Sequence, residues 1–236
     1  MQQLEKLGEN LWVHEDTMSL VANAQLRLRM CIVKLLNGGL WIHSPTALSP
    51  ELKAEVETLG TVDFIIGPSN GHNLWLRDWH EAYPNAAVYV SAGIPKKVPL
   101  KSYQILDESY DNIWHADLAY LYLPGVPFFN ESVFLHQTTK SLLVTDLIQN
   151  HSDPRPPGLP GFITRFVFKP LGFKGICVAP PLKLGFMIKD KKSFAAAIRK
   201  ISDWEFERII VTHGDIIEKN AKQVFLELCE RFLNNA

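Results

Sequence analysis

Short runs of branched apolar residues and one clear helical pattern make up the first third of the chain. Each run is too short for a helix and rich in the residues that favour strands. These runs are residues 27–36, 40–44 and 62–67. Residues 49–60 have helical spacing instead, with Ser49 as a capping residue, Pro50 in the first turn and Gly60 at the end. This part of the chain therefore predicts strands with a helix between them.

The later part of the chain continues the alternation of strands and helices. The predicted elements are a helix at about 74–83, a strand at 86–91, a hairpin-like pair ending at 141–148, a helix, a strand at 208–214 and a last helix at about 220–233. The last helix places Val224, Leu228 and Phe232 on one apolar stripe. Strands followed by alternating strands and helices favour a layered α/β protein over a helical bundle.

One segment differs from the rest of the expected single domain, residues 1–236. Residues 154–189 are rich in proline, glycine, phenylalanine and basic residues and contain no acidic residue. Prolines at this density exclude a long helix, so an irregular excursion is expected. It is either a covering loop or a lid for an anionic substrate or membrane face. In the second case Arg165, Lys169 and Lys174 would carry the charge.

Composition narrows the class of protein. The 236 residues are 47% hydrophobic with a formal net charge of -1, which is typical of a soluble globular protein and gives no electrostatic reason to expect nucleic acid as a partner. No apolar run is long enough for a transmembrane segment. The three widely spaced cysteines predict neither disulfides nor a cysteine metal site. We therefore expect a cytoplasmic protein.

Three polar residues stand where apolar strands end: His72, Asp146 and His213. Neighbouring strand ends in one sheet present their loops to a common crevice, so these side chains would converge if the strands are neighbours. Two imidazoles and a carboxylate suit a divalent metal with open coordination positions. Taken singly, each residue has a simpler explanation as a cap or turn residue.

The chain resembles the metallo-β-lactamase superfamily, and more closely a branch of it whose function is unknown. Four stretches carry the resemblance: "LWIHSPTALSPELKAEVETLG", "VDFIIGPSNGHNLWLRDWHEAYPNAAVYVSAG", "SLLVTDLIQN" and "WEFERIIVTHGDII". Together they extend over nearly the whole chain. The resemblance implies a four-layer αββα sandwich with metal held at one edge of the paired sheets.

The chain also departs from the superfamily pattern. The superfamily usually has His-x-His-x-Asp-His where this chain has "GPSNGH", so Gly67, Ser69 and Gly71 replace three ligands and only His72 remains. Its middle histidine should fall in "LPGVPFFNES", which has none. The resemblance matches Asp146 and His213 to ligands of the same metal site as His72, and it therefore implies one metal rather than two.

Two hypotheses of function follow from this reduced site. The first is a hydrolase of an ester, lactone or phosphoester, a small-molecule substrate not defined further, that uses one divalent ion, zinc or iron, on His72, Asp146 and His213. Asp146 and Asp215 are its candidate catalytic carboxylates. His151, expected to be exposed, and Asn73 are weaker candidates for orienting the ligands. The second hypothesis is a catalytically inactive module that binds a ligand or partner. Nothing in the sequence predicts the oligomeric state.

Overall fold

The structure is a computed structural model and describes residues 3–19, 25–151, 175–179, 182, 185 and 187–234. Most of the excursion expected at 154–189, including its three candidate basic residues, lies outside the described residues. A short part of it, Gly175–Val178, forms strand β12, which pairs with β11, Ile148–His151. Among the described residues, no helix is both long and apolar enough to cross a membrane.

A seven-stranded mixed sheet forms the N-terminal half of the fold. Its strands lie in sequence order: β1 Glu5–Gly8, β2 Leu11–Ser19, β3 Gln25–Lys34, β4 Leu40–His43, β5 Val62–Gly67, β6 Ala87–Ser91 and β7 Gln104–Leu106. The first four strands pair antiparallel, and β4 to β7 pair parallel. The parallel part places the ends of β4, β5 and β6 at one edge.

A four-stranded sheet faces the first, with the order β13-β10-β9-β8. Its strands are β8 Leu118–Tyr122, β9 Ser132–His136, β10 Ser141–Val144 and β13 Arg208–Val211. Strands β8, β9 and β10 are antiparallel neighbours, while β10 and β13 are parallel. The predicted strands therefore exist, and β10 and β13 end at the same edge.

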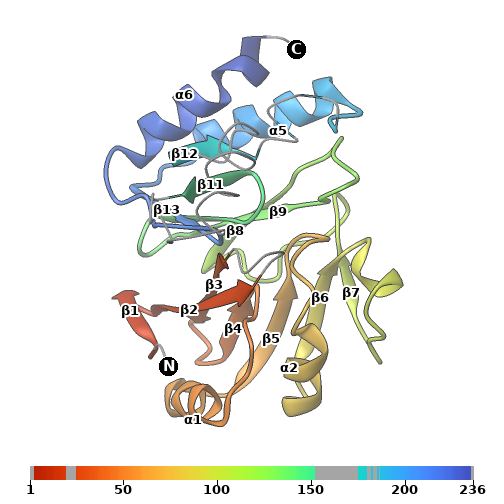
Figure 1. The fold of residues 1–236 in the computed structure, drawn as a ribbon, viewed down its shortest axis with the longest axis vertical. Coiled ribbons are helices and arrows are strands. Elements are labelled where there is room, and N and C mark those ends of the chain that lie inside the picture. The colour runs from red at the N-terminus through yellow and green to blue at the C-terminus, as the bar shows by residue number, and fades with distance from the viewer. Residues whose placement is uncertain are drawn as a thin grey trace.

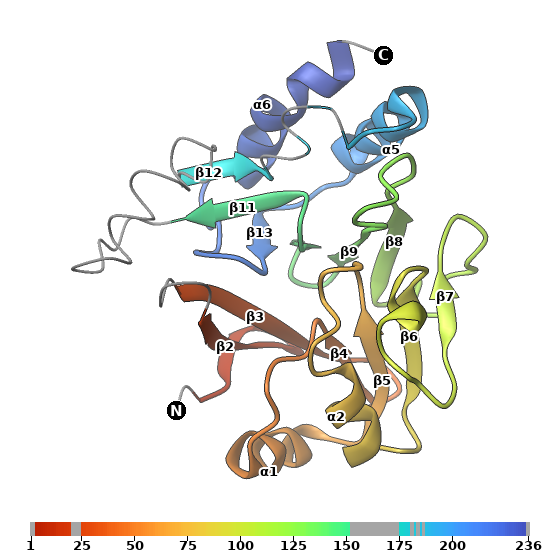
Figure 2. The ribbon, with the colours of Figure 1, turned by 45° about the vertical axis from the view of Figure 1, so that its right-hand side comes forward.

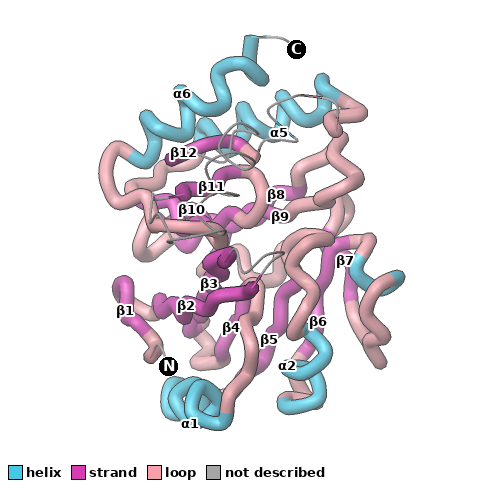
Figure 3. Tube along the Cα trace, viewed as in Figure 1, coloured by secondary structure: helices cyan, strands magenta, loops and turns pink. Residues whose placement is uncertain are grey.

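Helices cover the outer face of each sheet (Figure 1; Figure 3). The helices are α1 Pro50–Leu59, α2 Leu76–Ala82, α5 Lys191–Asp203 and α6 Ala221–Asn234, with a short 3-10 helix, η2, at Ile94–Lys96. Helices α1 and α2 lie against the seven-stranded sheet, and α5 and α6 lie beyond the four-stranded sheet. The order of layers is helix, sheet, sheet, helix, which confirms the αββα sandwich.

Alternation along the strands explains how two sheets bury three apolar layers. In β5, Ile65 packs towards α1 and α2, whereas Ile66 packs between the sheets. In β10, Leu142 packs towards α5 and α6, whereas Leu143 packs between the sheets. Successive side chains of a strand point to opposite faces, so a strand that is apolar throughout must be covered on both sides.

Local sequence accounts for the boundaries of the predicted helices. The Ser49 hydroxyl accepts a hydrogen bond of 3.1 Å from the Leu52 amide, which confirms the predicted cap of α1. In α6 the most buried positions include Phe225 and Cys229, whereas Val224 and Leu228 are only partly buried. Of the three residues predicted to form the stripe, Phe232 is buried as expected, whereas Phe225 and Cys229 take the places predicted for Val224 and Leu228.

Candidate metal centre

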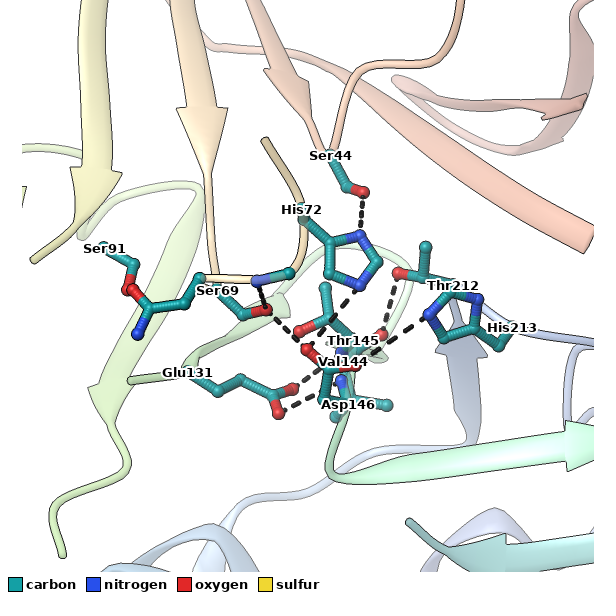
Figure 4. A network of polar contacts seen from close by, with 12 residues as sticks. Ser44, Ser69, His72, Ser91, Glu131, Val144, Thr145, Asp146, Thr212 and His213 are labelled. Atoms are coloured by element: carbon teal, nitrogen blue, oxygen red, sulfur yellow. Dashed lines mark hydrogen bonds and ion pairs between the residues drawn. The ribbon is translucent and has the colours of Figure 1, made fainter. Parts of the chain in front are cut away.

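His72, Asp146 and His213 meet at one edge of the sandwich, where parallel strands end. His72 lies in the loop after β5, Asp146 follows β10, and His213 follows β13. One possible ligand atom from each side chain lies within 4.8 Å of the others (Figure 4). The view in Figure 2 shows this edge from the side, with β5 below and β13 above. The structure thus brings together three residues that are separated along the chain by 74 and 67 positions.

Both histidines turn the same ring nitrogen towards the carboxylate. His72 Nε2 lies 3.7 Å from Asp146 Oδ2, and His213 Nε2 lies 3.9 Å from Asp146 Oδ1. The two imidazole centroids are 5.1 Å apart, and all three side chains are at least nine-tenths buried. These separations are too long for direct hydrogen bonds. The three groups therefore surround a common point rather than simply pairing with one another.

The other ring nitrogen of each histidine is held by the protein. His72 Nδ1 lies 2.7 Å from the Ser44 hydroxyl, and His213 Nδ1 lies 3.1 Å from the Arg27 carbonyl oxygen. A carbonyl oxygen can only accept, so His213 carries its proton on Nδ1 and leaves the Nε2 lone pair free. Histidines that bind metals typically have such a partner on the nitrogen away from the metal.

Arg27 also holds the segment that follows His213. Its guanidinium contacts the carboxylates of Asp215 and Glu15, and the Asp215 amide donates to the Asn150 carbonyl oxygen. Asp215, expected as a candidate catalytic carboxylate, is thus engaged with Arg27. It does not belong to the three-residue group around the common point. A catalytic role for Asp215 stays a prediction.

Asp146 is anchored by hydrogen bonds on its side chain and on its main chain. The Ser69 hydroxyl donates to Asp146 Oδ2 over 2.5 Å, and the Asp146 amide donates to Glu131 Oε2 over 3.1 Å. Burial opposes ionisation of this carboxyl, but the nearby His72 and His213 together with the Ser69 hydrogen bond hold the pKa of Asp146 below its ordinary value. The site therefore presents an ionised carboxylate between two imidazoles.

Glu131 is a residue of the site that the sequence pattern did not reveal. It is 1% exposed, and its two carboxylate oxygens accept hydrogen bonds from the Thr145 and Asp146 amides. Burial and the Asp146 charge raise the pKa of Glu131. The signal that could have located it is the register of the β9–β10 hairpin, in which Ser141 pairs with His136. Continued for five residues, this register places Asp146 opposite Glu131.

The pKa values of two buried imidazoles in this region are lowered by their surroundings. Burial and the proximity of His72 lower the pKa of His213 to about 4 and that of His43 to about 3. His43 ends strand β4, is 1% exposed and stacks on Trp41. Neutral imidazole is the form that binds a metal ion, so burial keeps His213 in its ligand form.

Two of the positions that lack a superfamily ligand, Gly67 and Ser69, are packed against other residues. A side chain on Gly67 would place its Cβ 2.7 Å from both Leu76 Cδ1 and Ile94 Cδ1. Ser69 is fully buried against Asp146. In the "LPGVPFFNES" segment Phe128 is 60% exposed. Among these residues, none offers a histidine to a second metal.

Asn70 ties the loop that carries His72 to two neighbouring loops. Its side-chain oxygen accepts from the Ser91 hydroxyl at 2.7 Å and from the Gly93 amide at 2.9 Å, and its side-chain nitrogen donates to the carbonyl oxygens of residues 127 and 128. The Asn73 side chain donates to the Asn70 carbonyl oxygen. Asn73 therefore stabilises this loop, and no contact of its side chain with the metal-ligand candidates is seen among the described residues.

His151 is half-buried, so its expected exposure was wrong. It ends strand β11, and its Nε2 lies 2.8 Å from Gln149 Oε1. Strand β11 lies beside the segment of His213, because the Asn150 amide donates to the His213 carbonyl oxygen. This pairing draws the polar "QNH" stretch into the fold. The three cysteines are free and buried.

Solved structures with the same fold are numerous, and all those compared share little sequence with this chain. A metallo-beta-lactamase from Pontibacter korlensis is 13% identical with a TM-score of 0.62, and the match covers 100% of each chain. The metallo-beta-lactamase FIM-1 from Pseudomonas aeruginosa, in its mono-zinc form, is 12% identical with a TM-score of 0.64, covering 98% of this chain and 95% of its own. The Flv1 flavodiiron core from Synechocystis sp. PCC6803 is 10% identical with a TM-score of 0.65, covering 99% and 61%. These similarities establish the metallo-β-lactamase fold.

Sequence comparison gives a family but no described activity. No curated protein matches the chain. A family profile described as "Domain of unknown function (DUF4336)" matches residues 8–159, which is 152 of the 236 residues and includes His72 and Asp146. His213 lies beyond the matched region. The chain has a metallo-β-lactamase fold and belongs to the DUF4336 family.

Proposed function

We propose that this protein binds one divalent metal ion, zinc or iron, through His72, Asp146 and His213 and acts as a metal-dependent hydrolase. The observation that carries the proposal is the convergence of one carboxylate and two Nε2 atoms within 4.8 Å of one another. The scaffold supports it, since similar folds are described as a mono-zinc metallo-beta-lactamase and a metal-soaked flavodiiron core.

The chemistry of the three side chains fits such an ion. Ligand atoms about 2.0–2.2 Å from a tetrahedral zinc ion lie roughly 3.3–3.6 Å from one another. With one ligand atom taken from each residue, the three atoms lie within 4.8 Å of one another, which is wider than that range, so the side chains would draw together around an ion. Two imidazoles and one carboxylate are a donor set used by both zinc and non-haem iron. The donor set therefore suits either metal.

Each part of the surrounding protein has a distinct role in this proposal. The Arg27 carbonyl oxygen keeps the proton of His213 on Nδ1, and Ser44 contacts the same atom of His72. Glu131 holds the main chain of Asp146 from the side away from the histidines. A bound divalent ion would supply Lewis acidity, lowering the pKa of water and polarising a carbonyl or phosphoryl oxygen. The substrate class we propose is accordingly an ester, a lactone or a phosphoester.

A single metal is proposed because the second position is closed to histidine. The Ser69 hydroxyl donates to Asp146 Oδ2, so this oxygen already has a protein partner. The space beside Gly67 is filled by Leu76 and Ile94. These contacts support a mononuclear site and argue against a two-metal site that has merely lost its ions.

Elemental analysis of untagged protein purified without chelators tests the proposal. We expect close to one zinc or iron per chain in the wild type, and loss of that metal in His72→Ala, Asp146→Ala and His213→Ala. The matched control is His136→Ala, which removes a buried histidine that lies on β9 outside the three-residue group. Metal retained in all three ligand variants would exclude this site.

A metal content that stays negligible after incubation with zinc, iron and manganese would contradict the hydrolase proposal. The alternative, an inactive module on the same fold, would then account for the filled positions at Gly67 and Ser69. If metal is present, wild type and Asp146→Ala should be assayed side by side with chromogenic esters, lactones and phosphoesters. Activity that is absent from the variant would assign hydrolysis to this centre.

A further inference from the structure

Ser44 combines a strained backbone with a contact to a candidate ligand. It directly follows strand β4, and its φ of 52° lies in the left-handed region. Residues other than glycine seldom adopt this conformation, because the side chain crowds the neighbouring carbonyl group. The conformation is imposed by the sheet, since the Ser44 amide donates to the Ile66 carbonyl oxygen at 3.0 Å. Glycine would relieve the strain at this position.

A serine at this position therefore needs a reason in its hydroxyl group. Ser44 is 4% exposed, so solvent does not satisfy its side chain. The contact that the structure gives the hydroxyl is His72 Nδ1, at 2.7 Å. In Figure 4 the hydroxyl lies on the side of the imidazole opposite Asp146. Backbone strain that is retained by the surrounding structure is a recognised feature of functional sites.

We infer that Ser44 is a positioning residue that prepares His72 as a metal ligand, an inference that rests on the proposed function. The hydroxyl accepts a hydrogen bond from the Nδ1–H group of His72, which directs the Nε2 lone pair towards Asp146. It does for His72 what the Arg27 carbonyl oxygen does for His213. The two ligand imidazoles are thus oriented from two different strands, β4 and β3, each through Nδ1.

Two substitutions separate the hydroxyl from the backbone strain. Ser44→Ala removes the hydroxyl and keeps a side chain in the left-handed region, whereas Ser44→Gly removes both. Loss of a group that orients a metal ligand typically weakens metal binding about 10- to 100-fold. We expect both variants to show a zinc dissociation constant raised by that factor, measured by competition with a chromophoric chelator.

The melting temperature of the metal-free proteins should depend on the backbone strain at residue 44, and not on the hydroxyl group. We expect Ser44→Gly to melt roughly 2–4 °C above Ser44→Ala, because only glycine relieves the left-handed conformation. The matched control is Asn10→Gly, which changes another non-glycine residue with positive φ, 57°, in the turn between β1 and β2. It should leave the zinc dissociation constant unchanged. A merely structural role for Ser44 would make the affinity follow the melting temperature.

Zinc affinity equal to wild type in both Ser44 variants would overturn the inference. A wild type that binds no metal would instead overturn the proposed function, and the nitrogen-15 NMR spectrum of His72 then decides the inference alone. In metal-free wild type we expect the proton on Nδ1, and in Ser44→Ala a shift of the tautomer population towards Nε2. An identical His72 spectrum in the two proteins would show that Ser44 does not position the ring.

Discussion

The candidate centre has two halves that differ in their surroundings. The retained half consists of the three ligand candidates, and the vacated half consists of the positions where the superfamily ligands are missing. In the retained half, His72, Asp146 and His213 converge, and each has a protein partner on the side away from the common point. In the vacated half, the Gly67 position is closed by apolar side chains and Ser69 is bonded to Asp146. The three ligand candidates are therefore held by hydrogen bonds, and the Gly67 and Ser69 positions are occupied by other contacts.

This difference teaches that a reduced site need not be a damaged one. Loss of ligands alone would leave polar groups without partners, and buried polar groups without partners are costly. Instead, Ser69 uses its hydroxyl on the carboxylate that remains, and Asn70 joins the surrounding loops. Ser69 in the vacated half thus supports the carboxylate of the retained half.

Introducing a histidine into the vacated half should change the free energy of unfolding more than any other substitution considered below. Gly67→His would drive a ring into the space of Leu76 and Ile94, whose methyl groups would lie 2.7 Å from the new Cβ. We expect the free energy of unfolding to fall by about 3 kcal/mol or more, because overpacking a filled core is destabilising. Chemical denaturation of the metal-free proteins measures this.

The control for that variant is Gly71→Ala in the same loop. Its Cβ would approach Asp146 Oδ2 at 3.4 Å, which is ordinary contact, so its cost should stay within about 1 kcal/mol. A Gly67→His protein as stable as wild type that also takes up a second zinc ion would refute the contrast between the two halves.

Zinc should stabilise the protein only while the retained half is intact. At a free zinc concentration of 100 times its dissociation constant, we expect about 2.7 kcal/mol of added stability in wild type. Asp146→Asn should gain none at the same concentration, because the ion loses its only anionic ligand in the group. Denaturation curves with zinc and with a chelator measure both.

Phe128→Ala is the matched control in the vacated half. This side chain is 60% exposed and lies in the segment where the resemblance places the missing middle histidine. It should keep the full stabilisation by zinc. An equal loss in Phe128→Ala and Asp146→Asn would show that the two halves do not differ in metal binding.

A buried histidine outside both halves contributes to the pH dependence of folding stability without belonging to the candidate centre. His136 is 1% exposed on β9, and burial lowers its pKa to about 4 from an ordinary 6.5. Because the unfolded chain takes up the proton first, this contribution to stability is present above pH 6.5 and is lost as the pH falls towards 4. The loss between pH 7 and pH 5 amounts to about 2 kcal/mol.

Replacing that histidine should remove this part of the pH dependence. We expect His136→Phe to lose about 2 kcal/mol less than wild type between pH 7 and pH 5, as measured by urea denaturation at each pH. Its zinc stoichiometry should not change, since His136 contacts Thr139 rather than the candidate ligands. An unaltered pH dependence would show that folding does not lower the pKa of His136.

The smallest expected change in stability comes from removing the hydrogen bond that joins the vacated half to the retained half. Ser69→Ala removes the hydrogen bond to the Asp146 carboxylate and should cost about 1.5 kcal/mol, since bonds to charged groups are the stronger ones. Ser91→Ala, which removes a bond to the neutral Asn70 oxygen, should cost less. The Ser69 variant should still bind one metal per chain. A cost no larger than that of Ser91→Ala would mean that Ser69 adds little to the retained half.

Much of the fold followed from local patterns. The cap at Ser49, the apolar runs of β5 and β10 and the final helix were all predicted at close to their observed positions. These features depend on spacing along the chain and on capping chemistry, which act over a few residues. The layer order came from the resemblance and not from the periodicity.

The candidate site was predicted less evenly. His72, Asp146 and His213 were visible because each ends an apolar strand, and the structure brings them together. Their role as metal ligands stays a prediction. Glu131 and Ser44 were missed, because a glutamate before a strand and a serine after one are ordinary in sequence. Only the hairpin register and the pairing of β4 with β5 give them their partners.

By itself, the sequence determined where strands and helices begin, which faces are apolar and which polar side chains stand at strand ends. The tertiary structure alone decided that the ends of β5, β10 and β13 share one edge, which partner holds each ligand candidate and how the vacated positions are filled. The physical reason is that local propensities act between near neighbours in the chain. A centre of this kind is made by contacts between segments that only the packing of two sheets brings within hydrogen-bonding distance.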